Sequence, residues 1–362
     1  MATPAPRLRR PSIDWLRGVA VVIMVLAHTM DAWTRDADRP TALYGLVVKI
    51  AGMGAPLFLF LAGVSVALAA GSRARATGDT AAAAASVQRR GWEIFAFAFL
   101  FRLQSWTIGL FRAPAASLLK VDILNIMGPA IVLAAAFWQG GRRPATRFAW
   151  LTGATVATAL LTPLVRGASF LAVLPDPLEW YLRPPPGRSW FTMFPWAGLL
   201  FAGGAVGVLL DEARDADRDR RLNLRFLGWG TALMAASFAG SYLPSIFANS
   251  SFWTTSPSYF FLRIGLMVGA LGLAWLWCRR PTAHRWSPML VLGTSSLFIY
   301  WVHIEVAYGS TSAAWRHALP IWQAVGGFLL LTGVMLVAAL VKNRVAAAWR
   351  ARRRRSVAIA RS

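Results

Sequence analysis

Long apolar blocks separated by short polar segments run along almost the whole chain. Most blocks are close to the 20 or so residues that an α-helix needs to cross a hydrocarbon core about 30 Å thick. The blocks predict ten membrane spans, at residues 13–30, 44–71, 91–111, 121–138, 148–165, 190–210, 226–242, 258–277, 288–307 and 320–341. We therefore expect an all-α fold, a polytopic bundle of about ten transmembrane helices.

Composition and charge support a membrane protein. Hydrophobic residues make up 57% of the chain and charged residues only 15%, and the mean hydropathy is +0.50. Soluble domains keep about a quarter of their residues charged. A net charge of +23 would suggest nucleic-acid binding in a soluble protein, but here the basic residues lie mainly between the apolar blocks. Membrane topology explains that placement, so we expect no nucleic-acid partner.

The distribution of basic residues also predicts orientation and domain organisation. With the N-terminus inside, the inner segments carry 26 Lys and Arg residues and the outer segments 8. The positive-inside rule then places both termini in the cytoplasm. The short loops indicate one transmembrane domain, 13–341, between a cytoplasmic segment, 1–12, and a basic cytoplasmic tail, 342–362, that suits anionic membrane lipid. Abundant Ala, Gly and Arg with only three lysines suggests a GC-rich bacterial genome, and hence the bacterial cytoplasmic (inner) membrane.

The first span carries ionisable residues that a lipid-facing helix would avoid. Arg17 and His28 are 11 residues apart, almost three helical turns, so both lie on one face about 16 Å apart. Asp14 and Asp31, each three residues further out, lie near the same stripe. Asp14 and Arg17 could equally serve only to orient the helix, with His28 marking the membrane interface.

Other spans add polar residues, mostly at a similar predicted depth. His303 and Glu305 lie in the outer third of the ninth span, at a depth comparable to that of His28. The two remaining histidines, His284 and His317, fall in loops and are expected to face solvent. We expect an outer-half cluster with two deeper arginines; its members are His28, Asp31, Asp122, Asn125, Arg263, His303 and Glu305, with Arg102 (beside Gln104) and Arg17 progressively deeper. The alternative is a set of unrelated buried ion pairs that hold the bundle together.

Histidines with nearby carboxylates suit general-base catalysis, because neutral imidazole takes a proton near neutral pH. Arginines, which stay charged when buried, suit phosphate or carbonyl binding. No serine-hydrolase elbow, phosphate-binding glycine loop or zinc-protease helix occurs at its required spacing, and the single cysteine allows no disulfide within the chain. No metal is expected. The small residues of "LLFAGGAVGVLL" (Gly203, Gly204, Gly207) and of "MGAPLFLFLAGVSVAL" predict close helix packing, with Pro56 as a kink.

Several stretches together resemble a known family. They are "IDWLRGVAVVIMVLAH", "MGAPLFLFLAGVSVAL", "RRGWEIFAFAFLFRLQ", "VDILNIMGPAIV", "SWFTMFPWAGLLFAGGAVG" and "SSLFIYWVHIEVAYG". Over most of residues 12–310 the chain is similar to bacterial relatives of the heparan-α-glucosaminide N-acetyltransferase family, within the membrane-bound acyltransferase superfamily. The superfamily's signature of an arginine, ten residues and a histidine is matched by Arg17 and His28.

The resemblance implies a multipass enzyme that moves an acyl group, typically acetyl from cytosolic acetyl-CoA or another acyl-CoA, to an acceptor across the membrane. The family's essential histidine corresponds to His28. We expect His28 to act as general base, oriented by Asp31 or another outer carboxylate and supported by Asp122 or Glu305, with His303 as a second base or acceptor ligand. Arg17 and Arg102 would bind the acyl donor, and Asn125, Arg263 and Gln104 the acceptor. A bacterial envelope glycan, a lipid-linked sugar or a small metabolite is the expected acceptor, and a homodimer stays open.

Two other classes remain. A multispan transporter or permease could use the same His, Asp and Arg residues for proton relay or solute binding. A structural partner in envelope assembly would need no chemistry, and the outer polar cluster makes this interpretation less economical. An acyltransferase should show a cytoplasmic CoA pocket that meets the outer cluster, whereas a transporter should show a mid-membrane site with two alternating exits.

Overall fold

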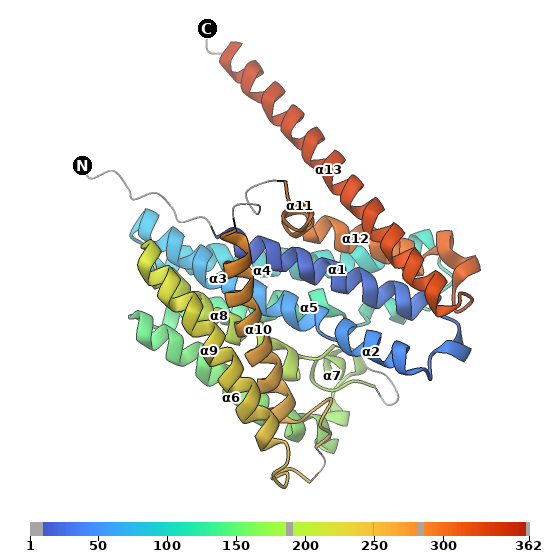
Figure 1. The fold of residues 1–362 in the computed structure, drawn as a ribbon, viewed down its shortest axis with the longest axis horizontal. Helices are drawn as coiled ribbons and strands as arrows, with labels where there is room; N and C mark the ends of the chain where they lie inside the picture. The colour runs from blue at the N-terminus through green and yellow to red at the C-terminus, as the bar shows by residue number, and fades with distance from the viewer. Residues whose placement is uncertain (1–9, 186–190, 249, 281–285, 360–362) are drawn as a thin grey trace. The chain divides into compact units, whose positions relative to one another are not determined.

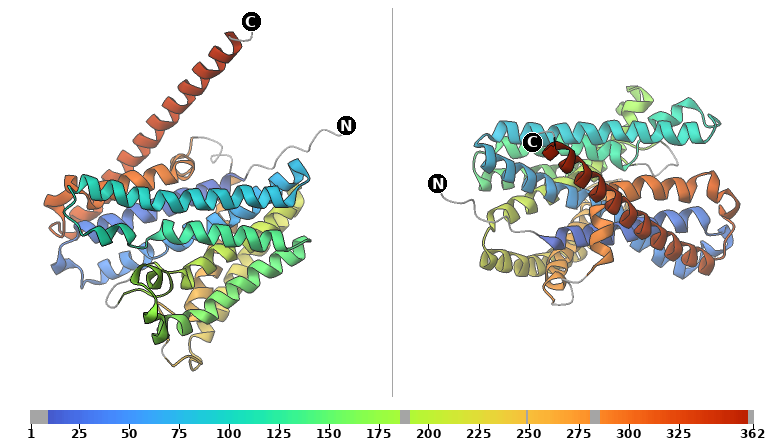
Figure 2. Two further views of the ribbon diagram at one scale, coloured as in Figure 1. Left: turned by 180° about the vertical axis from the view of Figure 1, so that it is seen from behind. Right: turned by 90° about the horizontal axis from the view of Figure 1, so that it is seen from above.

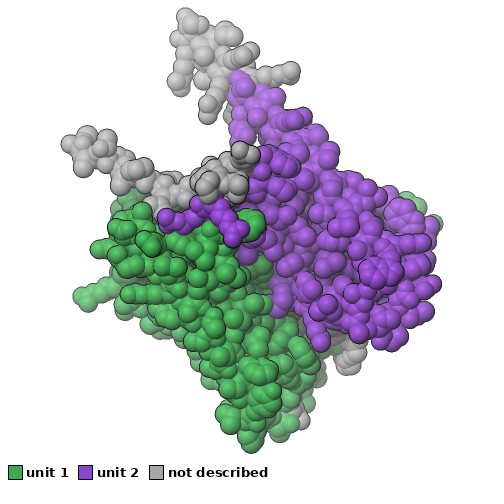
Figure 3. Space-filling model, in the orientation of Figure 1, with its two compact units in different colours: residues 1–13, 55–277 green, residues 14–54, 278–362 purple. Residues whose placement is uncertain are grey.

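The computed structural model describes residues 10–185, 191–248, 250–280 and 286–359, and almost all of them are helical (Figure 1). Within these ranges no strand forms, and the one β-bridge joins Thr34 to Leu319. The predicted all-α class is therefore confirmed. The chain divides into two compact units (Figure 3), unit 1 with residues 1–13 and 55–277 and unit 2 with residues 14–54 and 278–362.

Unit 1 consists mostly of long helices. Its first helix, α3, begins at Gly54, which is the last residue of the first segment of unit 2. Its elements are α3 (Gly54–Thr77), α4 (Thr80–Ile108), η2 (Ala115–Leu119), α5 (Ile123–Gly140), α6 (Pro144–Gly167), η3 (Ser169–Val173), α7 (Asp176–Leu182), α8 (Met193–Glu212), α9 (Ala216–Gly240) and α10 (Pro257–Cys278). Helix α4 packs along α5, and α6 along α8, while α5 also contacts both α6 and α8. Figure 2 shows α4 and α5 side by side and antiparallel.

Glycine lets α3 and α8 approach until their backbones touch. A Cβ atom added at Gly203 would lie 1.8 Å from the carbonyl oxygen of Phe60, and one at Gly63 would lie 1.9 Å from that of Leu200. At Gly207 the carbonyl oxygen of Val64 would be 2.7 Å away. No larger residue fits these positions without moving a helix. The predicted close packing of both glycine-containing stretches is confirmed.

Unit 2 contains α1 (Pro11–Trp33), whose first three residues are assigned to unit 1, and the short elements η1 (Asp36–Asp38) and η5 (Ser310–Trp315). Its other helices are α2 (Ala42–Ala51), α11 (Pro288–Thr294), α12 (Ser296–Tyr308) and α13 (Ile321–Ile359). Helices α11 and α12 meet at an angle of 88°. Helix α11 crosses α1 closely, because a Cβ at Gly18 would lie 2.0 Å from the carbonyl oxygen of Met289. Helices α11 and α12 both pack against α13.

Seven helices in the described residues are long and apolar enough to cross a membrane, and eight if the bent α11–α12 pair is one span. Seven of the ten predicted spans coincide with the seven, and the span at 288–307 coincides with the bent pair. The spans predicted at 91–111 and 226–242 lie on α4 and α9, which do not meet the same criterion. Both helices include strongly charged stretches, "QRRGWE" and "DRDRRLNLR". The number ten and the cytoplasmic termini stay predictions.

One local expectation, the kink at Pro56, differs from the structure. The break in the second span falls at Gly52 and Met53, between α2 and α3, so no kink forms at Pro56. Proline fits the first turn of a helix, where its missing N–H breaks no helical hydrogen bond. Helix α13 continues without a break through residue 342, and the cytoplasmic tail at 342–362 stays a prediction.

The α3–α8 contact gives a first test. We expect Gly203→Ala to destabilise the protein by about 1–3 kcal/mol, because its methyl group would overlap the Phe60 carbonyl. Thermal unfolding in detergent would record a lower midpoint. Gly153→Ala on α6 is the matched control, since nothing lies within 4 Å of its added Cβ. An unchanged midpoint in the Gly203 variant would show that the two helices separate at no cost and would contradict the proposed packing.

Candidate functional site

Two histidines from distant parts of the chain meet inside unit 2. Nδ1 of His28, on α1, lies 2.8 Å from Nε2 of His303, on α12. Their rings are stacked, with centroids 5.0 Å apart and planes at 27°. His303 is completely buried and His28 is partly exposed. The expectation that these two histidines lie together is met by the geometry of the unit.

Contacts at the ends of α1 and α12 hold this pair in place. The indole Nε1 of Trp33 donates a buried hydrogen bond of 3.0 Å to the carbonyl oxygen of Ala307, one turn beyond His303. The segment after α12 is fixed to the end of α1 by backbone hydrogen bonds, including Leu319 N–H to the Trp33 carbonyl at 2.9 Å. Two helices tied at their ends in this way keep a fixed register.

The second ring nitrogen of each histidine has a different environment. Nδ1 of His303 lies 2.7 Å from the carbonyl oxygen of Ile299, one turn earlier on α12. Both nitrogens of His303 are therefore engaged. Within the described part of the chain, Nε2 of His28 forms no hydrogen bond. His28 thus has one nitrogen fixed by a neighbour and one left for another molecule.

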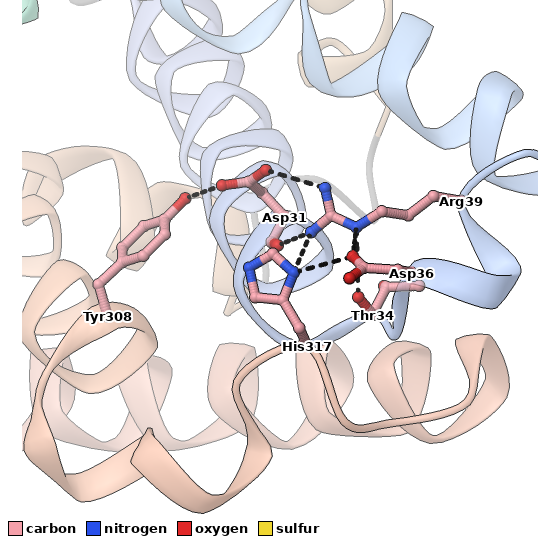
Figure 4. A network of polar contacts seen from close by, with 6 residues as sticks. All are labelled: Asp31, Thr34, Asp36, Arg39, Tyr308 and His317. Atoms are coloured by element: carbon pink, nitrogen blue, oxygen red, sulfur yellow. Dashed lines mark hydrogen bonds and ion pairs between the residues drawn. The ribbon is translucent and has the colours of Figure 1, made fainter.

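We had expected Asp31 to orient His28 directly, but the carboxylate of Asp31 contacts two other side chains. Its Oδ2 accepts a hydrogen bond of 2.7 Å from the hydroxyl of Tyr308, and its Oδ1 lies 3.9 Å from Nη1 of Arg39 (Figure 4). The ring of Tyr308 stands edge-on to the ring of His28, with centroids 5.7 Å apart. The carboxylate is therefore linked to His28 through the tyrosine ring, and the direct partner of His28 is an imidazole.

A polar network lies beside Asp31 and was missed in the sequence. Nη2 of Arg39 lies 3.2 Å from Nδ1 of His317, and that nitrogen is also 3.1 Å from Oδ1 of Asp36 (Figure 4). His317, expected to face solvent, is 45% exposed and takes part in this network. From the sequence, Arg39 was counted only among the basic residues of the outer segments. Its position eight residues after Asp31, in a short loop, could have indicated an ion pair between the two.

Asp38 closes the same loop onto α13. Hydrogen bonds from the guanidinium of Arg35 and from the backbone amide of Ile321 hold the pKa of the Asp38 carboxyl below its ordinary value. The carboxylate thereby ties the loop after α1 to the start of α13. The loop that carries Arg39 is therefore attached at both ends.

A second polar group lies in unit 1, at the start of α5. Asp122 is the N-cap of α5, and its Oδ1 accepts hydrogen bonds from the amides of Leu124 and Asn125. The side chain of Asn125 returns a bond of 3.0 Å by accepting the amide of Asp122, which completes a capping box. The structural role of both residues follows from the four-residue pattern that begins the helix.

The other oxygen of Asp122 faces a cation. Its Oδ2 lies 3.1 Å from Nη2 of Arg102 on α4, and the carboxylate side chain is only 9% exposed. This ion pair lacks hydrogen-bond geometry, so Oδ2 of Asp122 and Nε of Arg102 are buried without a hydrogen-bond partner in the described structure. Tyr181 of α7 lies beside the pair, since its hydroxyl accepts a 3.4 Å bond from Asn125. Arg102 thus contacts the N-cap residue of α5, and its expected depth in the membrane stays a prediction.

The remaining predicted site residues are more dispersed. Arg17 pairs with Asp14 at 2.7 Å, one turn earlier on α1. Arg263, on α10, places its guanidinium 4.0 Å from the ring centre of Tyr259, and no carboxylate of the described chain forms an ion pair with it. The other two predicted site residues are Gln104, on α4 two residues beyond Arg102, and Glu305, half-buried on α12 two residues beyond His303. His284, which was expected to face solvent, lies outside the described residues.

The residues of the predicted cluster belong to two units, and each unit brings some of them together. Unit 2 brings together His28 and His303, with Asp31 near them through Tyr308. Unit 1 brings together Arg102, Asp122 and Asn125. The first group can exchange a proton with a ligand, and the second can bind a ligand's polar or charged atoms. Within the described ranges, no three His, Cys, Asp or Glu side chains are grouped so that they could hold a metal ion.

Comparison with known proteins bears on the first nine helices. Residues 9–237, more than half of the chain, match the family model described as "Heparan-alpha-glucosaminide N-acetyltransferase, catalytic". The matched segment includes His28, Arg102 and Asp122, whereas Arg263 and His303 lie beyond it. A search of curated proteins gives no significant match. With its apolar, membrane-length helices, this chain is a multi-pass membrane protein that belongs to the heparan-α-glucosaminide N-acetyltransferase catalytic-domain family.

Proposed function

We propose that the protein is an acetyltransferase of the bacterial cytoplasmic membrane that uses acetyl-CoA, or another acyl-CoA, with His28 as general base. The observation that carries this proposal is the imidazole of His28, which lies in the segment matched to the family and has one ring nitrogen held and the other unbonded. Neutral imidazole is the side chain best suited to take a proton near neutral pH.

The proposed step uses His28 twice. Its Nε2 takes the proton of an acceptor hydroxyl or amine as that oxygen or nitrogen attacks the thioester carbonyl. The carbon–sulfur bond then breaks, and the departing CoA thiolate receives the proton back from His28. Atoms and charge balance without another reagent, and the base returns to its starting state.

The Arg102–Asp122 pair supports a binding role in the same reaction. Both residues have a buried polar atom without a hydrogen-bond partner, and burying such atoms is costly unless a ligand or water completes them. Asn125, Gln104 and Arg263 are proposed to help bind the acceptor, and Arg17 with Arg102 the CoA donor. The acceptor is proposed to be an envelope glycan, a lipid-linked sugar or a small metabolite.

A permease would have to use the same histidines as a proton relay. The bonded chain runs from His28 to His303 and stops at the carbonyl oxygen of Ile299. A backbone carbonyl accepts a hydrogen bond but does not take up and pass on a proton. The geometry therefore favours a base that exchanges its proton with bound substrate over a relay that crosses the helix.

Replacing His28 tests the proposed function directly. We expect His28→Ala to lower acetyl transfer by about 10²–10⁴-fold, the usual contribution of a general base. Transfer would be measured as labelled acetyl moving from acetyl-CoA into envelope material of membranes that contain the protein. Calorimetry in nanodiscs should show that the variant still binds acetyl-CoA, which separates loss of chemistry from loss of folding. Full transfer by the variant, or no acetyl-CoA binding by the folded wild type, would refute the proposal.

The ion pair is tested by removing one charge and then both. Asp122→Asn keeps an N-cap, since Asn caps as well as Asp, but leaves Arg102 without its counter-charge. We expect it to cost about 1–3 kcal/mol of stability, and the double variant Arg102→Gln/Asp122→Asn to recover part of that loss. Acetyl transfer should fall in both variants, because the single variant loses the carboxylate of the proposed binding pair and the double variant loses both of its charges. If the double variant transfers acetyl as well as wild type, the pair is structural only.

A further inference from the structure

The hydrogen bond between His303 and Ile299 fixes where one proton lies. A carbonyl oxygen can only accept a hydrogen bond. Nδ1 of His303, 2.7 Å from the Ile299 oxygen, must therefore carry a hydrogen. In a neutral imidazole only one nitrogen is protonated, so Nε2 of His303 has a free lone pair.

That lone pair in turn fixes the neighbouring ring. Nε2 of His303 points at Nδ1 of His28 from 2.8 Å, a hydrogen-bond distance. Since Nε2 of His303 has no hydrogen, Nδ1 of His28 must donate one. Neutral His28 then carries its hydrogen on Nδ1 and a lone pair on Nε2. The opposite tautomer would set two lone pairs against each other beside the fully buried ring of His303.

We infer that His303 is a positioning residue: the Ile299–His303–His28 chain holds His28 in the Nδ1–H tautomer and leaves Nε2 as its only basic nitrogen. This inference deepens the proposed function, on which its catalytic meaning rests. It also changes the role of His303, which we had expected to be a second base or an acceptor ligand. Neither ring nitrogen of His303 is left for substrate, because one meets Ile299 and the other His28.

The chain also determines how the base works. After His28 takes a proton at Nε2, its Nδ1–H still donates to His303, so the imidazolium keeps its orientation. The proton can leave His28 only by the way it came, because the chain ends at a carbonyl. Proton removal from the acceptor and proton return to the CoA thiolate must then both occur at Nε2, on one side of the ring.

¹⁵N NMR of the histidine side chains determines the tautomer of His28 in the absence of substrate. The chain has only four histidines, so protein labelled with ¹⁵N at histidine gives few side-chain signals, and single variants assign them. We expect the neutral rings of His28 and His303 both to be protonated at Nδ1 and bare at Nε2. In His303→Leu, which removes the acceptor, His28 should shift toward the Nε2–H form that free imidazole side chains prefer. In His303→Gln the side-chain oxygen can accept from Nδ1, so the wild-type pattern should persist.

Kinetics of the same variants connect the tautomer to catalysis. We expect His303→Leu to lower kcat about tenfold or more with little change in the KM for acetyl-CoA, because a base in the wrong tautomer cannot take the proton. His303→Gln should keep most of the activity. His317→Gln is the matched control, since that histidine belongs to unit 2 but contacts Asp36 and Arg39 instead; it should change neither kcat nor the His28 signals.

Two results would overturn the inference: a wild-type His28 protonated at Nε2, or a His303→Leu variant whose His28 signals do not change. Both NMR results test the tautomer of His28 whether or not the protein transfers acetyl groups. If His28→Ala retains full transfer while the expected tautomers are seen, the proposed function is wrong and the hydrogen-bonded chain stands. The two failures are therefore distinguishable.

Discussion

A polar side chain inside a helix bundle must find a partner, and that constraint organises the two polar groups around His28 and Asp122. Burying an unpaired hydrogen-bonding atom costs about 1–3 kcal/mol, and an unpaired charge costs more. Unit 2 meets the requirement with two imidazoles and a carbonyl oxygen, a chain that is neutral throughout. Unit 1 meets it with a carboxylate that caps a helix through one oxygen and faces a guanidinium with the other. Nε2 of His28 and the buried atoms of the Arg102–Asp122 pair have no hydrogen-bond partner in the described structure, and these are the atoms that the proposed function assigns to ligands.

These partners meet only because the helices that carry them approach closely. Gly18 brings α1 against α11, and the bend between α11 and α12 then sends α12 along a different direction. Trp33 and the segment at residues 317–319 tie the end of α1 to the residues on either side of η5. The histidine pair therefore depends on residues that do no chemistry. A glycine at a crossing and an indole at a helix end set the 2.8 Å contact as surely as the two imidazoles do.

Much of this arrangement could be predicted from the sequence, and the limit lies in geometry. The apolar blocks located the helices, because the length of a span is fixed by membrane thickness, and the glycine spacing correctly predicted the α3–α8 contact. Similar depth in two spans was enough to pair His28 with His303. It was not enough to choose the partner of a nitrogen, because depth says nothing about rotation of a helix about its axis. Asp31 was expected at His28 for that reason, whereas it bonds Tyr308, which lies beyond His303 at the end of α12. Likewise the cap at Asp122 was readable only once the start of α5 was known.

There is a chemical reason why the partner of His28 is an imidazole, that of His303. A carboxylate beside His28 would stabilise the imidazolium but would also place a net negative charge in an apolar bundle whenever the base is neutral. A second imidazole fixes the same nitrogen with no charge at rest. In the proposed reaction the thioester is uncharged and so is a hydroxyl acceptor, so the resting site would need no counter-ion. In the proposed reaction, positive charge would develop on His28 only while negative charge develops on the attacked carbonyl, and the two would stabilise each other. A base held by a neutral neighbour thus confines charge separation to the reacting atoms, which is what an apolar environment favours.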